Sequence, residues 1–242
     1  MMSHRLLCGL LGLLSLLALF VIGAGFAGTT TAADAVTIWA GQPSQHTVAL
    51  TFDDGPSPTY TREILALLRQ YQAKATFFVL GEKVEKYPEL IRAMVRDGHE
   101  VGNHTFDHAR LTKTAQPARE RELERTQLDL DLLGCPEKDE LIRPPYSAFD
   151  NRLVSYCKHT HRDIVLWSVD SGDWRGLGAQ AIVHNVLDRV KNGSIVVFHD
   201  SDEKSEKDRR PTVEALKIIL PALKAQGYRM VTISELACSQ PH

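Results

Sequence analysis

The 242-residue sequence has few cysteines, few aromatic residues and almost no net charge. It holds four cysteines, 7% of its residues are aromatic, and its formal net charge at pH 7 is −2. The near-neutral charge argues against nucleic acid as the main partner, because nucleic-acid-binding domains carry an excess of Lys and Arg. With 43% hydrophobic and 24% charged residues, the chain is neither disordered nor collagen-like. The composition predicts a packed globular protein.

Long apolar runs are absent except at the start of the chain. Residues 1–33 contain one basic side chain, Arg5, and no acid, and residues 6–28 are almost purely apolar. A basic start, an apolar run and a small-residue end predict a secretory signal cleaved after Ala33. The apolar run is also long enough to span a bilayer, so an uncleaved anchor is the alternative. Either outcome predicts a secreted or cell-surface protein whose only membrane contact is this segment.

Cysteine chemistry is not expected in the part that follows. Cys135, Cys157 and Cys238 remain there, and an odd number permits at most one internal disulfide in an oxidising compartment. Their spacing contains no CxxC pair of the kind that binds metal. We expect a monomer whose function rests on other side chains.

From residue 47 onward, short β-branched or aromatic runs alternate with amphipathic stretches of helical period, which is typical of βα units around a parallel sheet. The predicted strands are residues 48–53, 75–80, 99–102, 140–143, 163–169, 194–199 and 229–233. The predicted helices are residues 59–72, 82–97, 117–133, 151–158, 178–191 and 212–226. We therefore expect a short segment at 34–46, one α/β domain at 47–237 and a tail at 238–242.

Seven βα units predict a closed or nearly closed barrel, with a doubly wound open sheet as the alternative. In both architectures functional residues lie at the carboxyl ends of the strands. Asp53 and Asp54 follow the first predicted strand, and adjacent strand residues point to opposite sides, so the two acids cannot be equivalent. His104 and His108 follow the third strand; we expect them on one face of a helical turn, where with Asp54 they would form a three-ligand metal site.

Three further polar clusters follow strands. RPPY at 143–146 places Arg143 and Tyr146 on a proline-stiffened loop, although a rigid turn is the simpler explanation. DSGDW at 170–174 offers acids and Trp174, which suits either sugar stacking or core packing. VFH at 197–199 delivers His199 to the same end of the sheet, a natural acid–base position, although a lone histidine is more often structural.

The charged stretch at residues 202–210 stands between a predicted strand and a predicted helix. A solvated loop is the favoured interpretation, and a substrate-facing loop is the alternative.

In this order, TFDDGP, HTFDH, RPPY, DSGDW and VFH resemble the five motifs of the polysaccharide deacetylases, the NodB-homology domain of carbohydrate esterase family 4. The resemblance covers about residues 48–236. It implies a distorted (β/α)7 barrel in a single catalytic domain. It also implies removal of N-acetyl groups from an amino-sugar polymer, with peptidoglycan N-acetylglucosamine as the first substrate and chitin oligomers as the second.

The resemblance also assigns roles. Asp53 would be the general base, and Asp54, His104 and His108 would hold one divalent ion, usually Zn²⁺, with Co²⁺, Mn²⁺ or Ni²⁺ as alternatives. The ion would activate water and polarise the acetamide carbonyl. His199 would protonate the leaving amine.

The remaining roles concern the surroundings of these groups. Arg143 would orient Asp53, and Asp170 would pair with His199 and raise its pKa. The backbone N–H of Tyr146 would contribute to the oxyanion site. Trp174 and Val197 would shape the acetyl pocket, and Pro145 is grouped with these substrate-binding residues.

Three positions depart from the family pattern: Val197 replaces the usual Leu, Ser147 follows RPPY where Gly is common, and Ala109 follows His108 where Pro is common. They concern pocket shape and not the reaction type. Two other functions stay open, an O-acetyl-xylan esterase and a carbohydrate-binding protein on an inactive scaffold. The intact Asp53 and His199 argue against the second.

Overall fold

The structure is a computed structural model that describes residues 37–135, 140–204 and 207–238. The predicted export segment at 1–33 and the last four residues lie outside the described residues. Within these ranges, no helix has the length and apolarity needed to cross a membrane.

Strand β2 (Thr47–Gly55) lies in the middle of the sheet. All nine of its residues are buried, which explains why its sequence is apolar without alternation until the acids at its end. It pairs in parallel with β3 (Thr76–Val79), β8 (Ser194–His199) and β9 (Arg229–Val231). The carboxyl ends of these strands therefore meet at the same edge.

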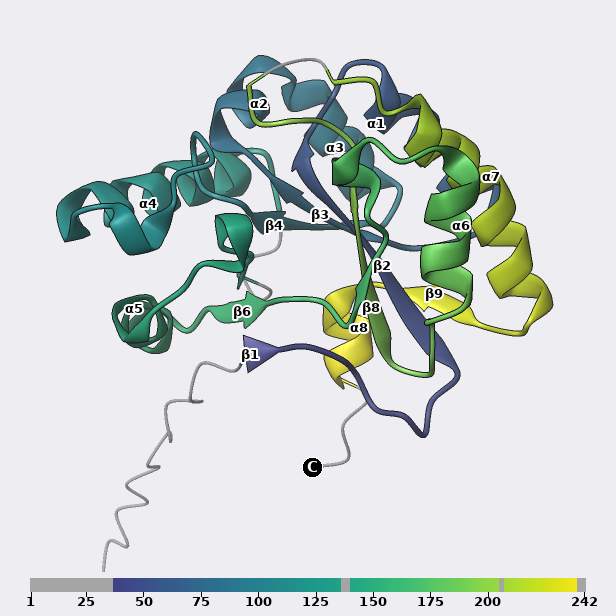
Figure 1. Ribbon diagram of the computed structural model, residues 1–242. Coiled ribbons are helices and arrows are strands. Elements are labelled where there is room, and N and C mark those ends of the chain that lie inside the picture. Colours follow the sequence, from purple (N-terminus) through teal and green to yellow (C-terminus); the bar gives the residue numbers. More distant parts are fainter. Residues whose placement is uncertain (1–36, 136–139, 205–206, 239–242) are drawn as a thin grey trace, which may run out of the picture. The chain divides into compact units, whose positions relative to one another are not determined.

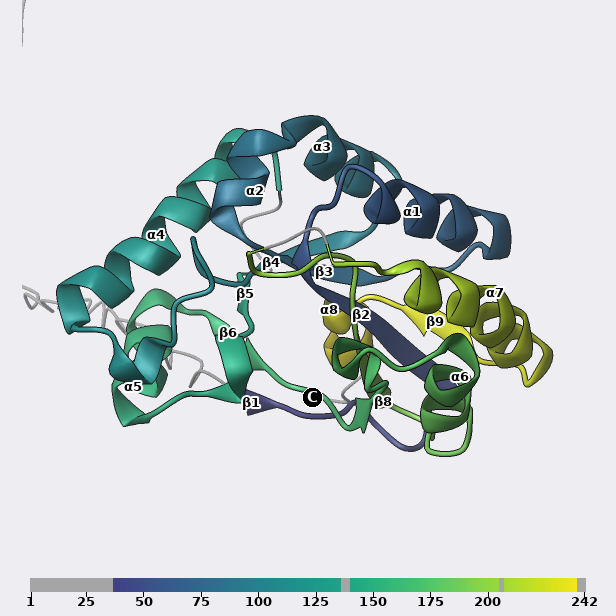
Figure 2. The ribbon, with the colours of Figure 1, turned by 45° about the horizontal axis from the view of Figure 1, so that its top comes forward.

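The nine-stranded sheet has the order β1-β6-β5-β4-β3-β2-β8-β7, with β9 beside β2. The strands not yet named are β1 (Thr37–Ile38), β4 (Glu100–Asn103), β5 (Leu141–Ile142), β6 (Asp163–Val165) and β7 (Val169–Asp170). The strands pair in parallel, and the sheet curls into a half-barrel with helices outside it (Figures 1 and 2). The expected α/β fold of the (β/α)-barrel type is confirmed.

The predicted strand at 163–169 is in fact two strands. Its first half, β6, pairs with β5 and β1, and its second half, β7, pairs with β8. Between them the N–H of Leu166 donates to the Ile38 carbonyl at 2.8 Å, and the N–H of Ser168 donates to the Ile195 carbonyl at 3.0 Å. One short segment thus links the two sides of the curled sheet, a partner change that an apolar run does not reveal.

The helices surround the sheet in an arc, except for the last one, which lies inside the curl of the sheet (Figure 2). They are α1 (Tyr60–Tyr71), α2 (Gly81–Lys86), α3 (Pro88–Arg96), α4 (Gln116–Leu132), α5 (Asn151–Thr160), α6 (Ala179–Leu187), α7 (Arg210–Ala225) and α8 (Ile233–Cys238). The predicted helix at 82–97 is interrupted where Pro88 begins α3, because proline is favoured in a first helical turn and not in a helix interior. Helix α8 was not expected.

The two faces of the sheet pack against different partners. Side chains such as Phe52 and Phe77 pack against the outer helices, including Ile64 of α1 and Leu216 of α7. On the other face Phe78 packs in a smaller cluster that includes residues of α8. Truncation of any of these buried side chains to alanine is expected to lower the free energy of unfolding by about 2–5 kcal/mol. This packing keeps the strand ends in fixed positions.

Cys135 and Cys157 are free thiols and are buried. Burial raises the pKa of Cys135 to about 11 and that of Cys157 to about 12. Thiols with such values carry little thiolate at neutral pH and are poor nucleophiles. The side chain of Cys238 lies outside the described part.

Candidate active site

Five strand ends bring the predicted polar clusters to one cavity of about 410 Å³. Its lining includes Asp53 and Asp54 from β2, the two motif histidines after β4, Tyr146 after β5, and His199 from β8. Residues separated by up to about 150 positions in the sequence therefore share one pocket. The placement agrees with the rule that ligands bind at the carboxyl ends of parallel strands.

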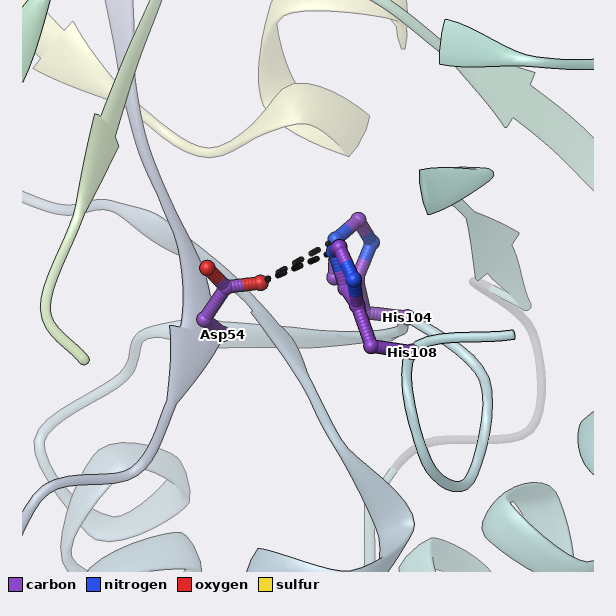
Figure 3. Close-up of side chains that lie close together, drawn as sticks. All are labelled: Asp54, His104 and His108. Atoms are coloured by element: carbon purple, nitrogen blue, oxygen red, sulfur yellow. Dashed lines mark ion pairs between the residues drawn. The ribbon is translucent and has the colours of Figure 1, made fainter. Parts of the chain in front are cut away.

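A carboxylate and two imidazoles converge on one point at the wall of this cavity. Asp54 Oδ1 lies 3.4 Å from His104 Nε2 and 3.3 Å from His108 Nε2, and both rings are directed toward the carboxylate (Figure 3). One ligand atom from each residue lies within 4.8 Å of the others. Asp54 Oδ1 is buried and has no hydrogen-bond partner among the described residues.

The outer nitrogens of both imidazoles are occupied. His104 Nδ1 lies 2.6 Å from the Arg143 carbonyl, and His108 Nδ1 lies 2.7 Å from Glu203 Oε2. Because these partners are acceptors, we assign the proton to Nδ1 in each ring, which leaves the Nε2 lone pair facing Asp54. Burial, and then the neighbouring His104, lower the pKa of His108 and favour its neutral form. Three electron-pair donors that face one another without a proton fit a divalent cation.

The predicted helical turn at 104–108 is wrong, because this segment is an irregular loop. Thr105 and His108 have left-handed φ values of 71° and 65°, which an α-helix excludes. Asn103 Oδ1 accepts the N–H of Thr105 at 2.9 Å, and Glu122 of α4 accepts two further backbone N–H groups at 3.0 and 3.1 Å. The two histidines, four residues apart, are thus positioned by a loop that polar side chains hold in place.

Asp54 is set apart from Asp53 by a bulge in β2. The pairing of β2 with β3 shifts register between Asp53 and Gly55, and Asp54 has a φ of 70°. Lys83 of α2 donates from Nζ to the Asp54 carbonyl at 2.9 Å. The bulge re-aims the side chain of Asp54 toward the histidines, so two consecutive acids have different surroundings.

Asp53 forms a buried ion pair with Arg143. The Arg143 side chain is fully buried, and its Nη1 lies 2.7 Å from Asp53 Oδ1 and 2.7 Å from Thr51 Oγ1. Its other nitrogens donate to the carbonyls of Val165 and Leu166 at 3.3 and 3.1 Å. A guanidinium with all three nitrogens engaged holds the Asp53 carboxylate in one orientation. This geometry matches the orienting role expected of Arg143.

The expected pairing of Asp170 with His199 is wrong, because Asp173 takes that position. Asp173 Oδ1 lies 2.8 Å from His199 Nδ1, and Asp173 Oδ2 accepts the backbone N–H of His199 at 2.8 Å and the Thr212 hydroxyl at 3.0 Å. Burial lowers the pKa of His199, but the charge and hydrogen bond of Asp173, together with the charges of Asp54 and Asp53, outweigh burial and raise this pKa to about 9. Gly172, with a φ of 73°, turns the chain so that Asp173 reaches His199.

Asp170 instead supports the tryptophan at the cavity rim. Its carboxylate accepts the Gly172 N–H at 2.8 Å and the Trp174 indole N–H at 3.3 Å. Trp174 is 47% exposed and lines the cavity. This resolves the earlier choice in favour of a pocket wall, since a core tryptophan would be buried.

Val197 lines the cavity as expected, but Pro145 does not. Pro145 is buried at the start of a one-turn 3₁₀ helix, Pro145–Ser147, and Pro144 lines the cavity in its place. Trp167, which lies between β6 and β7, is a further lining residue that the motifs did not indicate.

The charged stretch at 202–210 is not simply a solvated loop. Asp202, Glu203, Lys207 and Arg209 line the cavity. Arg209 is only 2% exposed, and its Nε donates to the Ser201 carbonyl at 2.7 Å. Composition could not show that these residues line the cavity, because exposed loops contain the same residue types. The burial of Arg209 is what distinguishes this stretch from a solvated loop.

Comparison with known proteins agrees with this geometry. A family model described as polysaccharide deacetylase matches residues 40–165. A peptidoglycan-N-acetylglucosamine deacetylase of Bacillus cereus is 40% identical over 204 residues, covering 82% of this chain and 91% of that protein. The chain belongs to the polysaccharide deacetylase family. The enzyme class expected from the motifs, a polysaccharide N-deacetylase, is confirmed.

Two further members of the polysaccharide deacetylase family are similar over most of the chain. A chitooligosaccharide deacetylase of Sinorhizobium fredii is 40% identical over 198 residues, covering 78% of this chain and 89% of that protein. The crystal structure of the Bc1960 peptidoglycan N-acetylglucosamine deacetylase superposes with a TM-score of 0.78 at 34% identity. It covers 84% of this chain and 94% of that one.

Proposed function

We propose that this protein is an exported, zinc-dependent enzyme that removes the acetyl group from N-acetylglucosamine of peptidoglycan. The observation that carries the proposal is the placement of two ion pairs, Arg143–Asp53 and Asp173–His199, beside Asp54, His104 and His108. We call these last three residues the three-donor group. Asp53 and His199 are register partners on the neighbouring strands β2 and β8. A substrate amide in the cavity therefore meets a base and an acid at once.

Asp54, His104 and His108 would hold the ion. When bound, a divalent ion supplies Lewis acidity that polarises the acetyl carbonyl and makes water a better nucleophile. Zinc suits one carboxylate and two imidazoles with a position left open.

The side chains of this enzyme perform the proton transfers. Asp53 accepts a proton from the attacking water, and the C–N bond breaks as His199 donates its proton to the leaving amine. With a pKa near 9, His199 holds that proton at neutral pH. The products are acetate and a free amino sugar, and the N–H of Tyr146 stabilises the charge that develops on the carbonyl oxygen.

Peptidoglycan is favoured as substrate because a relative at 40% identity and a similar solved structure carry that activity in their names. Chitin oligomers are the second candidate, because the chitooligosaccharide deacetylase is also 40% identical to this chain.

The test measures acetate released by the purified full-length chain from peptidoglycan, chitin hexamer and acetylated xylan, followed by mass spectrometry of the sugars. We expect zinc-dependent release from peptidoglycan, loss on chelation and loss in Asp53→Asn. Release that survives chelation, or release from xylan alone, would overturn the proposal. Glycan binding in calorimetry without acetate at any divalent metal would favour an inactive scaffold.

Export is the second part of the proposal and rests on the sequence of residues 1–33. Cell fractionation of a C-terminally tagged chain, followed by N-terminal sequencing, tests it. We expect the protein outside the cytoplasm, beginning at Asp34 if the segment is cleaved. A cytoplasmic protein that retains residue 1 would contradict it.

A further inference from the structure

Glu203 contacts two residues of the site at once, and none of the five motifs contains it. Its Oε2 lies 2.7 Å from His108 Nδ1 and 2.7 Å from the Tyr146 hydroxyl. The His108 and Tyr146 rings pack edge to face with centroids 4.6 Å apart. One carboxylate oxygen therefore ties an imidazole of the three-donor group to the tyrosine of the RPPY loop.

The two imidazoles of the three-donor group are held in different ways. His104 donates to the backbone carbonyl of Arg143, a residue fully buried in the barrel. His108 has a negatively charged partner, brought by a loop that follows β8. A carboxylate on the outer nitrogen of an imidazole fixes its tautomer and orientation and makes the inner nitrogen a stronger donor to a metal.

The backbone that carries Glu203 is itself anchored. Lys83 Nζ donates to Ser201 Oγ at 2.8 Å and to the Asp202 carbonyl, and it also donates to the Asp54 carbonyl. Arg209 donates to the Ser201 carbonyl from the other direction. The carboxylate is thus placed before any ion binds, so little conformational entropy is lost when the site fills.

We propose that Glu203 is a positioning residue of the metal site, which holds the His108 ring so that Nε2 faces Asp54 and so strengthens metal binding. The inference rests on the proposed function, since it takes Asp54, His104 and His108 as the ligands. It predicts that Glu203 acts through His108, and that its removal weakens the site without removing a ligand.

The test measures the zinc dissociation constant of the full-length apo-protein by competition with a chromogenic chelator. We expect Glu203→Ala to raise this constant by about 10- to 100-fold, the usual effect of removing such an outer partner. Glu203→Gln keeps an acceptor oxygen but loses the charge, so we expect a smaller rise. Far-UV circular dichroism and the apo-protein melting temperature should match the wild type in both variants.

A matched control is available at the C-terminal end of α6, where His184 Nδ1 and Asp188 Oδ2 form an exposed pair at 2.9 Å. Asp188→Asn removes a carboxylate from an imidazole away from the cavity and should leave the zinc constant unchanged. If Glu203→Ala binds zinc as tightly as the wild type and Asp188→Asn, the inference is wrong. Zinc binding by a wild type that releases no acetate would instead contradict the proposed function and leave this inference standing.

Discussion

The Arg143–Asp53 and Asp173–His199 pairs each join a buried side chain to one that faces the cavity, but the buried partner is the cation in the first pair and the anion in the second. In the first, a buried cation with all three nitrogens hydrogen-bonded orients an acid that faces the cavity. In the second, a fully buried acid holds an imidazole that faces the cavity. In the proposed mechanism, position therefore decides the roles: the partner that faces the cavity reacts, and the buried partner sets its orientation and charge.

The largest expected effect comes from breaking the first pair. Arg143→Met leaves the Asp53 carboxylate buried without its cation, so we expect the free energy of unfolding to fall by about 3–5 kcal/mol. Chemical denaturation measures it. The double variant Arg143→Met/Asp53→Asn should recover part of this loss, because no unpaired charge remains; a strictly additive double variant would contradict the interpretation.

Breaking the second pair should change the pH dependence of catalysis. In Asp173→Asn the pKa of His199 should fall from about 9 toward its usual value near 6.5, because the largest contributions that oppose burial, the charge and hydrogen bond of Asp173, are lost. In the proposed mechanism His199 donates a proton, so activity should be lost as pH rises through this pKa. The alkaline limb of kcat/KM should therefore move to lower pH, and at pH 8.5 the rate should fall by about 10²-fold or more.

The same pair predicts a pH-dependent stability. Because the pKa of His199 is raised in the folded state, its contribution to the free energy of unfolding is fully present below pH 6.5 and is lost as pH rises through about 9. Wild-type stability should fall over this window more steeply than that of Asp173→Asn. Urea unfolding at pH 6 and pH 9 measures the free energy of unfolding of both proteins. A change between the two pH values that is equal in the wild type and in Asp173→Asn would contradict this.

A smaller effect is expected from Thr212→Val, which removes the hydroxyl that donates to Asp173 Oδ2 at 3.0 Å. A lost hydrogen bond to a charged group costs about 1.5–3 kcal/mol of stability. The Asp173–His199 contact is retained, so the alkaline limb should stay in place. A limb that moves as far as in Asp173→Asn would show that Thr212 controls the pair.

The smallest effect is expected from Asp170→Asn. Asp170 holds Trp174 and not His199, and an amide oxygen still accepts from the indole N–H, so kcat/KM should fall by less than about tenfold, the equivalent of 1.4 kcal/mol. The alkaline limb should not move. A shift like that of Asp173→Asn would restore the original assignment of Asp170.

Much of the site could be predicted because its information is local. A polar cluster directly after a predicted strand marks the edge at which that strand ends, and parallel strands bring those edges together. Asp53, Asp54, His104, His108, Arg143 and His199 were found in this way, and all of them lie at the cavity or directly behind it. The assignment needed neither exact strand bounds nor the number of strands.

The predictions that were wrong concerned contacts between residues that are distant in the sequence or separated by a turn. Asp170 and Asp173 lie on either side of Gly172, and only the turn at that glycine decides which one reaches His199. Residue order was enough to predict the fold class, the candidate ligands Asp54, His104 and His108, and an acid–base position for His199, because periodicity and strand ends are properties of neighbouring residues. The proposed role of Asp53 as the base follows from the resemblance of the motifs to the polysaccharide deacetylases. Only the tertiary structure decided that Asp173 pairs with His199, that residues 104–108 form a loop, and that Glu203 holds His108, because hydrogen bonds between distant segments depend on distances and directions that residue order does not contain.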